Sequence, residues 1–254
     1  MIESSFLETL DLYCLSGVDE VVADAPVNRF FADASDFPPP AESPRPIPEN
    51  PNFFSAAPAA VKAQGLPELK AMLENFDGCG LRKTAQNLVF GTGQAVSPDV
   101  MIVGEAPGAE EDRIGEPFVG ASGRLLDLML KSINLSRRES VYITNVVPWR
   151  PPANRKPSED EISACLPFLR CHISLVKPKI LLLLGGISLS AVLRVSGGIT
   201  KSRGIWMTYE SDDKTLLPAM ASFHPAYLLR TASQKKNAWR DFLCVRAKLN
   251  ELNG

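Results

Sequence analysis

The sequence lacks an apolar run long enough to cross a membrane, and its N-terminus lacks the basic-then-apolar order of a secretory signal. Both absences favour a cytoplasmic protein. It also lacks any C-x-x-C pair, since its five cysteines, Cys14, Cys79, Cys165, Cys171 and Cys244, are scattered. Without a secretory signal, we expect these to be reduced, buried thiols rather than a disulfide framework.

The chain carries little net charge, -2 at neutral pH, but the charge is unevenly distributed. Residues 1–50 hold ten Asp or Glu and two Lys or Arg, which gives -8. The remainder holds 25 Lys or Arg and 19 Asp or Glu, which gives +6. A mildly basic body with an acidic arm is compatible with a polyanionic partner but does not require one.

The length of 254 residues suits one sizeable α/β domain with extensions. Residues 1–24 alternate apolar and acidic side chains and are predicted to form a short helical N-terminal arm. Residues 25–54 are predicted to be an acidic linker, because the seven prolines between Pro38 and Pro51 exclude helix. The predicted domain is 55–254.

Within that domain, apolar runs alternate with patterns of helical spacing. The predicted buried strands cover residues 100–103, 141–147, 179–184 and 216–221, and residues 88–93 are a further strand or extended loop. The predicted helices cover residues 55–75, a segment starting near 122, 158–176, 188–195 and the C-terminal segment. This alternation predicts a three-layer α/β/α fold with a central, mainly parallel four-stranded sheet.

Three polar loops should meet at the carboxyl edge of this sheet, where open α/β sheets bind ligands. The first runs from Glu105 to Phe118, the second holds Asn145, and the third runs from His224 to Arg230. Each is weak evidence alone: the first could be an ordinary turn, Asn145 a structural cap, and His224 a packed loop histidine.

Taken together and in order, four segments resemble the uracil-DNA glycosylase superfamily, and most closely its bacterial and archaeal family 4. They read GEAPGAEED from Gly104, GEPFVGASG from Gly115, VYITNVV from Val141 with RPPANRKP from Arg150, and FHPAYLLR from Phe223. The resemblance covers about residues 76–245. It implies a monomeric enzyme of the bacterial cytosol or nucleoid that hydrolyses the N-glycosidic bond of a flipped-out uracil in DNA, leaving an abasic site for base excision repair.

The resemblance also implies roles for individual residues. Phe118 matches the aromatic ring that stacks on the base, and Asn145 matches the amide that reads uracil and rejects cytosine. His224 matches the donor to uracil O2, and Glu105 matches the carboxylate that orients water or supports the cationic sugar. The backbone N–H of Ala106 faces the base, and Glu111 is a weaker candidate for blocking the methyl group of thymine, in a segment that could equally be a solvated turn.

The resemblance places other residues on the DNA. The 224–230 loop enters the helix, with Leu228 or Arg230 filling the gap, although residues 227–229 could instead belong to the core. Ser122 and Gly123 begin a helix whose N–H groups could hold a phosphate. Basic side chains that could add backbone contacts, or be ordinary surface charges, are Arg150, Arg155, Lys156, Lys201 and Arg203.

The chain departs from family 4 at the [4Fe–4S] cluster that its members usually hold on four cysteines. Cys79 and Cys165 match the second and fourth ligands, but Phe76 and Trp149 stand at the first and third positions. Because neither aromatic residue can bind iron, we predict that there is no cluster and no other cofactor or metal. Phe76 and Trp149 should fill its volume, leaving Cys79 and Cys165 as neighbouring free thiols.

Several alternatives remain. No catalytic lysine is evident, which favours a glycosylase without a lyase step. The enzyme could act on another deaminated base, such as hypoxanthine or xanthine, or be a non-catalytic DNA-binding relative. The branch that bonds covalently to DNA through an inserted histidine is excluded, because the only histidines are His172 and His224 and neither follows Gly115 in the first loop.

Overall fold

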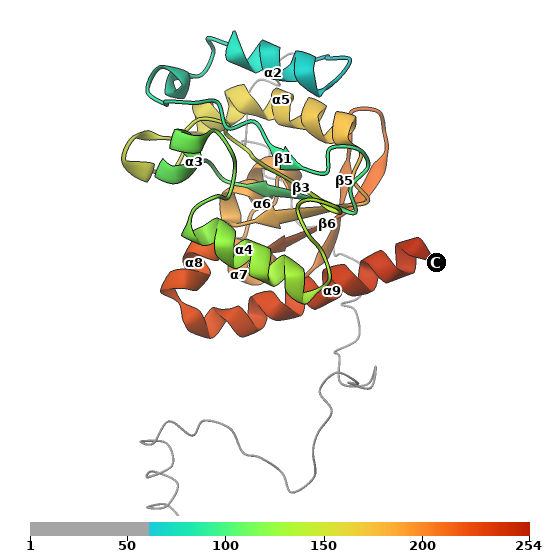
Figure 1. Cartoon of the computed structure of the whole chain (residues 1–254). Helices are drawn as coiled ribbons and strands as arrows, with labels where there is room; N and C mark the ends of the chain where they lie inside the picture. Colours follow the sequence, from blue (N-terminus) through green and yellow to red (C-terminus); the bar gives the residue numbers. More distant parts are fainter. Residues whose placement is uncertain (1–60) are drawn as a thin grey trace, which may run out of the picture. The chain divides into compact units, whose positions relative to one another are not determined.

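The computed structural model describes residues 61–254, so the predicted arm and linker lie outside the described residues (Figure 1). A six-stranded sheet runs through this part of the chain in the order β1-β3-β2-β4-β6-β5. The strands are β1 (Thr92–Gly93), β2 (Val100–Gly104), β3 (Val141–Asn145), β4 (Ile180–Leu184), β5 (Trp206–Glu210) and β6 (Leu216–Ser222). The four inner strands are parallel, which confirms the predicted α/β fold, and two antiparallel edge strands extend the predicted sheet.

Helices cover both faces of the sheet, as the three-layer prediction requires (Figure 1). The helices are α2 (Leu66–Glu74), α3 (Ala109–Ile114), α4 (Ala121–Ser132), α5 (Glu159–Val176), α6 (Gly186–Leu193), α7 (Ile199–Ser202), α8 (Pro225–Arg230) and α9 (Lys235–Asn253), with 3-10 turns η2 (Gly80–Lys83), η3 (Pro152–Asn154) and η4 (Ala232–Gln234). None of these helices of residues 61–254 has the length and apolar character needed to span a membrane.

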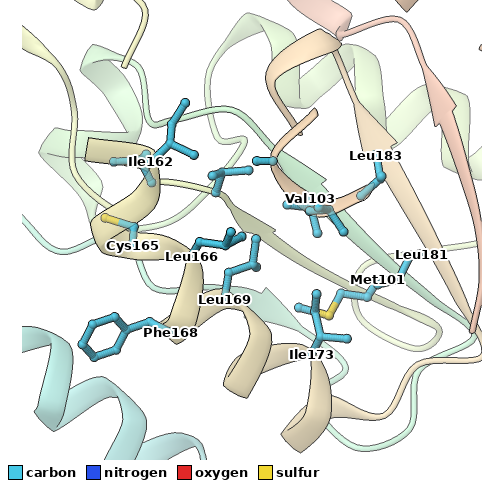
Figure 2. Close-up of a cluster of buried hydrophobic side chains, with 14 of the residues drawn as sticks. Met101, Val103, Ile162, Cys165, Leu166, Phe168, Leu169, Ile173, Leu181 and Leu183 are labelled. Carbon is cyan, nitrogen blue, oxygen red and sulfur yellow. The ribbon is translucent and has the colours of Figure 1, made fainter. Parts of the chain in front are cut away.

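The parallel strands are buried on both faces because they alternate their side chains between two cores. Met101, Val103, Leu181 and Leu183 point into a first core on the side of α5, which Figure 2 shows. The intervening residues of the same strands, such as Ile102 and Leu182, join a second core with helices α4 and α9. Burial of both faces explains why these strands read as continuous apolar runs.

Several predicted boundaries were wrong. In the described part of the helix predicted over 55–75, residues 61–65 are not helical and α2 begins at Leu66, because Pro67 favours the first turn of a helix; residues 55–60 lie outside the described residues. Strand β5 was not predicted, since its burial alternates and it is held by antiparallel pairing with β6. Two segments predicted as loops, 105–118 and 224–230, contain the short helices α3 and α8, and helix α7 was not predicted.

Ser158 and Glu161 form a capping box at the start of the helix predicted over 158–176. The Ser158 hydroxyl accepts a hydrogen bond from the Glu161 backbone N–H at 3.2 Å, and the Glu161 carboxylate accepts from the Ser158 N–H at 2.7 Å. This fixes the start of α5 directly after the basic segment 150–157, and so sets the position of that segment at the edge of the sheet.

Candidate active site

The three polar loops do meet at the carboxyl edge of the parallel strands. Gly104, at the end of β2, lies beside Asn145, at the end of β3, and Leu184 of β4 lies beside Ser222 of β6. Glu105 and His224 follow these strand ends within two residues. A pocket of about 710 Å³ lies there, and eight of the nine predicted site residues line it: Glu105, Ala106, Glu111, Phe118, Ser122, Asn145, His224 and Arg230.

Asn145 presents an unsatisfied acceptor to this pocket. The residue is buried, and its Oδ1 has no hydrogen-bond partner in the described part of the chain. A buried acceptor without a partner costs on the order of 1–3 kcal/mol, so it marks a place where a ligand N–H could bind. Gly104 makes the position possible, because a Cβ there would lie 2.3 Å from Asn145 Oδ1.

Phe118 is held in the pocket by an unusual backbone conformation. Its φ of 54° lies in the left-handed region, which is uncommon for a bulky side chain. Its ring is buried and lies 5.4 Å from the His224 ring, with 31° between the planes. Gly123 is required beneath it, since a Cβ there would lie 1.7 Å from the Phe118 carbonyl oxygen.

Two charged residues hold the backbone on either side of Phe118. Glu111 accepts from the N–H groups of Val119 and Gly120 at 3.0 and 2.9 Å, and from the N–H of Gly108 at 3.1 Å. Its one carboxylate therefore joins the loop that follows Glu105 to the loop that carries Phe118.

Arg137 holds the other side of this turn. It donates to the carbonyl oxygens of Phe118 at 2.8 Å and Pro117 at 3.2 Å, and its Nε donates to Asp127 at 2.9 Å. Arg137 was not predicted as a site residue, because nothing in the sequence around it distinguishes it from a surface arginine.

The alternative reading of the 110–112 segment as a solvated turn does not hold for all of its residues. Asp112 is buried in α3 and accepts from the N–H groups of Gln86 and Asn87 at 2.8 and 3.1 Å. Only Glu110 is exposed. The acidic segment is thus a short helix fastened to the residues before β1.

Glu105 and His224 both line the pocket from partly buried positions. Burial raises the pKa of Glu105 above its ordinary value, and the positive charge of Lys156 opposes that shift. Burial, and then the charge of Arg230, lowers the pKa of His224 to about 4. His224 Nδ1 accepts from the Ala226 N–H at 3.2 Å, so the neutral ring carries its proton on Nε2.

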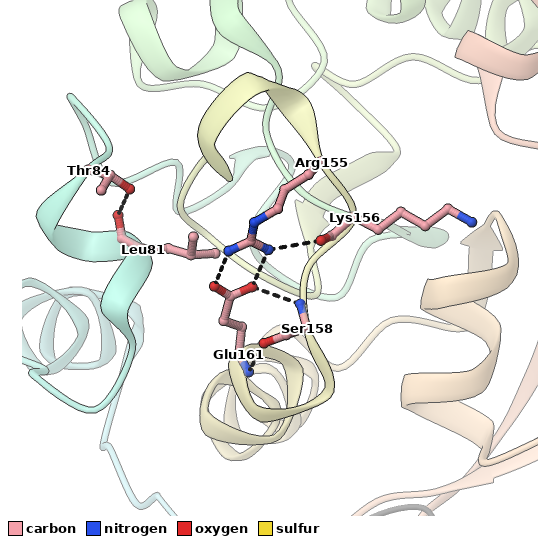
Figure 3. A network of polar contacts seen from close by, with 6 residues as sticks. All are labelled: Leu81, Thr84, Arg155, Lys156, Ser158 and Glu161. Carbon is pink, nitrogen blue, oxygen red and sulfur yellow. Dashed lines mark hydrogen bonds and ion pairs between the residues drawn. The ribbon is translucent and has the colours of Figure 1, made fainter.

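The predicted DNA contacts divide into two groups. Ser122, Arg155, Lys156 and Arg230 line the pocket, and Arg155 forms a two-bond ion pair with Glu161 at 2.6 and 2.8 Å, which Figure 3 shows. Arg203 instead points inward, where its Nε donates to the buried Asp241 at 3.0 Å. That interior ion pair does not support the predicted phosphate contact of Arg203.

Leu228 is the predicted site residue that the pocket does not include. It is fully buried in a small core with Phe223 and Ala238, as the alternative core reading of this segment anticipated. The neighbouring Leu229 is 49% exposed. Because α8 is a helix rather than a loop, Leu228 faces inward and Leu229 is the leucine presented to solvent.

The residues at the cluster position do not fit a [4Fe–4S] cluster. Such a cluster needs four thiolates, and within the described part of the chain only Cys79 and Cys165 lie together. Among residues 61–254, no group of three or more His, Cys, Asp or Glu side chains is placed to hold a metal ion. Phe76 stacks on Trp149 at 6.5 Å and contacts Phe168 at 4.7 Å between ring centroids, so aromatic packing lies where the other two ligands would be.

The prediction that the cysteines are buried was wrong for Cys244, and Cys14 lies outside the described residues. Cys79, Cys165 and Cys171 are buried free thiols, whereas Cys244 is exposed. A hydrogen bond from Cys165 lowers the pKa of Cys79 to about 7.

Comparison with known proteins agrees with this site. A family model described as the uracil DNA glycosylase superfamily matches residues 90–243. A type-4 uracil-DNA glycosylase of Sulfurisphaera tokodaii is 39% identical over 185 residues, which cover 71% of this chain and 83% of that protein. One from Thermotoga maritima is 41% identical over 160 residues, covering 62% and 79%, and a type-5 enzyme of Pyrobaculum aerophilum is 34% identical over 143 residues, covering 51% and 62%. The chain therefore belongs to the uracil-DNA glycosylase superfamily.

Proposed function

We propose that this protein is a monofunctional uracil-DNA glycosylase that hydrolyses the N-glycosidic bond of a flipped-out uracil in base excision repair. The observation that carries the proposal is the buried, unpartnered Asn145 Oδ1 beside an aromatic ring in a pocket of about 710 Å³. The relatives named above as uracil-DNA glycosylases support the same conclusion.

The base would be recognised by Asn145 and Phe118. Uracil presents an N3–H donor and an O4 acceptor, and one amide can pair with both when Oδ1 accepts and Nδ2 donates. Cytosine reverses both groups, so a fixed Asn145 rejects it. Phe118, held against its own backbone preference, supplies the flat apolar face on which an extruded base stacks.

His224 and Glu105 would act on the bond between the base and the sugar. As the C1′–N1 bond breaks, negative charge gathers on uracil O2, and the neutral His224 offers an Nε2–H donor there. Glu105 orients the attacking water or supports the positive charge that develops on the sugar. The backbone N–H of Ala106, in the same pocket wall, adds a donor toward the base.

The remaining site residues would exclude thymine and hold DNA. Glu111 lines the pocket while its oxygens accept from backbone N–H groups, so it can reject the thymine methyl only by its bulk. Ser122, at the start of α4, and Arg230 would contact phosphates. For the side chain that fills the gap in the duplex, the exposure of Leu229 makes it the better candidate than Leu228.

The test is cleavage of a labelled oligonucleotide containing one uracil, single- or double-stranded. Wild type should cleave, while Asn145→Asp and His224→Ala should lose activity by two orders of magnitude or more. The matched control, Asn250→Asp on the exposed face of α9, should cleave like wild type. Cleavage of hypoxanthine or xanthine but not uracil would replace the proposed substrate, and binding without cleavage of any base would indicate a non-catalytic relative.

The same assay tests whether the enzyme is monofunctional. Lys156 lines the pocket and is the lysine there that could attack the sugar. We expect borohydride to trap no protein–DNA adduct and the abasic strand to stay intact until alkali is added. A trapped adduct that disappears in Lys156→Gln would show a lyase step.

A further inference from the structure

The two thiols beneath the basic edge of the pocket are arranged as a pair. Cys79 and Cys165 are 2% and 1% exposed, and the Cys165 thiol donates to Cys79 Sγ. The Arg82 N–H donates to the Cys79 carbonyl oxygen at 3.2 Å, which holds the backbone of Cys79 at the start of the η2 turn. The two buried thiols therefore lie next to each other within the first core.

We propose that Cys79 and Cys165 are a dithiol–disulfide site, which on oxidation cross-links the η2 turn to helix α5. This inference goes beyond the proposed glycosylase activity and does not depend on it. With hydrogen peroxide as the oxidant, Cys79 Sγ attacks one peroxide oxygen to give a sulfenic acid and a water molecule. Cys165 Sγ then displaces the hydroxyl group, which leaves as a second water when the Sγ–Sγ bond forms.

Cys79 and Cys165 lie on elements of very different length. Cys165 lies in the middle of α5, an 18-residue helix packed on the sheet (Figure 2). Cys79 precedes a four-residue turn, so the approach to bonding distance falls on that turn. Because Cys79 is buried, its oxidation should be slower than modification of the exposed Cys244.

The cross-link would stabilise the pocket wall that carries Arg155. Glu161 lies one helical turn before Cys165 on α5, and it anchors Arg155 through two hydrogen bonds. Arg155 in turn donates to the Lys156 carbonyl oxygen, and Leu81 of the η2 turn lies beside this network in Figure 3. A bond between residues 79 and 165 closes a long chain loop, so the oxidised protein should melt about 5–10 °C higher.

The first experiment maps the bond in the full-length protein. Purified protein is treated with hydrogen peroxide, remaining thiols are alkylated in denaturant, and peptides are identified by mass. We expect a peptide pair joined through Cys79 and Cys165, two hydrogens lighter than the separate thiols and released by reductant, with Cys171 alkylated. Alkylation of both Cys79 and Cys165 after exhaustive oxidation, or iron and acid-labile sulfide near one cluster per chain, would overturn the proposal.

The second experiment measures the effect of the bond. Reduced and oxidised wild type are compared by thermal melting, with Cys79→Ser and Cys165→Ser as variants and Cys244→Ser as the matched control. Wild type and Cys244→Ser should show the reversible rise, and the other two should not. A cross-linked wild type that melts at or below the reduced temperature would show that the native fold does not accommodate the bond. Neither readout uses glycosylase activity, so failure of the proposed function would leave this result unaffected.

Discussion

Gly104→Ala should remove most of the activity without adding or deleting any functional group. The Cβ of alanine would lie 2.3 Å from Asn145 Oδ1 and 2.7 and 2.8 Å from two ring carbons of Phe118. Ordinary van der Waals contact begins near 3.4 Å. The base-reading amide and the stacking ring must therefore both move by about 1 Å, a displacement that can cost about 100-fold in rate.

Gly104→Ala should lower both kcat/KM and the free energy of unfolding. A 100-fold fall in kcat/KM corresponds to about 2.7 kcal/mol of lost transition-state stabilisation. Overpacking of the site should lower the free energy of unfolding by about 1–3 kcal/mol, which for a domain of this size lowers the Tm by roughly 2–10 °C. The variant should thus remain folded at 25 °C while losing activity, and free uracil should inhibit it more weakly than wild type.

Uracil-release kinetics and thermal melting of Gly104→Ala beside Gly80→Ala would test this reasoning. A Cβ at Gly80 meets nothing within 4 Å, so the control adds the same methyl group without a clash and should resemble wild type. If Gly104→Ala keeps kcat/KM within threefold of wild type, the pocket does not depend on the close approach of Asn145 and Phe118. These two residues would then not recognise the base as proposed.

Two substitutions at the pocket and the deletion of the acidic arm test other features of the protein. Glu111→Gln turns its NH₂ group toward the Gly108 N–H or toward the N–H groups of Val119 and Gly120, which leaves a backbone donor without an acceptor. The free energy of unfolding should fall by about 1–3 kcal/mol and kcat/KM by about tenfold or more. An unchanged Tm and rate would refute the positioning role. Lys156→Gln removes the positive charge that lowers the Glu105 pKa, so that pKa should rise. The acid limb of the plot of kcat/KM against pH should then move to higher pH, and the control Lys201→Gln should leave it in place. Deletion of residues 1–50 removes a charge of -8 and leaves a chain with a charge of +6. If the acidic arm competes with DNA for the basic surface, the shortened protein should bind DNA more tightly than the full-length protein, and most so at low salt. Equal affinities of the full-length and shortened proteins would reject that competition.

The parallel core and the convergence of the three loops could be predicted because they rest on strong local signals. Buried parallel strands are continuous apolar runs, and Glu105, Asn145 and His224 lie at or just beyond the ends of three of them. Strand order need not be known for such residues to share one edge, since all parallel strands present their carboxyl ends on the same side.

The features that could not be predicted from the sequence depend on contacts between residues that are distant in the chain. Helix α3 has six residues, too few to be stable alone, and Asp112 fastens it to the chain before β1. Arg203 could not be told from a DNA-facing arginine without Asp241, nor Arg137 from a surface charge without the Phe118 carbonyl. In α8, helical geometry rather than composition turned Leu228 inward and Leu229 outward.

The two cores explain how the chain can depart from family 4 at the cluster position and keep its pocket. Cys79, Cys165 and Trp149 belong to the core on the α5 side of the sheet, whereas Phe118 belongs to the opposite core. Glu111 and Arg137 fix Phe118 through backbone groups, and none of their contacts with the Phe118 turn passes through the aromatic or thiol residues of the first core. Asn145 and Glu105 are set by the pairing of β2 and β3, which the cluster position does not enter. Phe76 and Trp149 therefore occupy the cluster position in the first core, and the groups that would read and release the base are held in place by contacts that do not involve them.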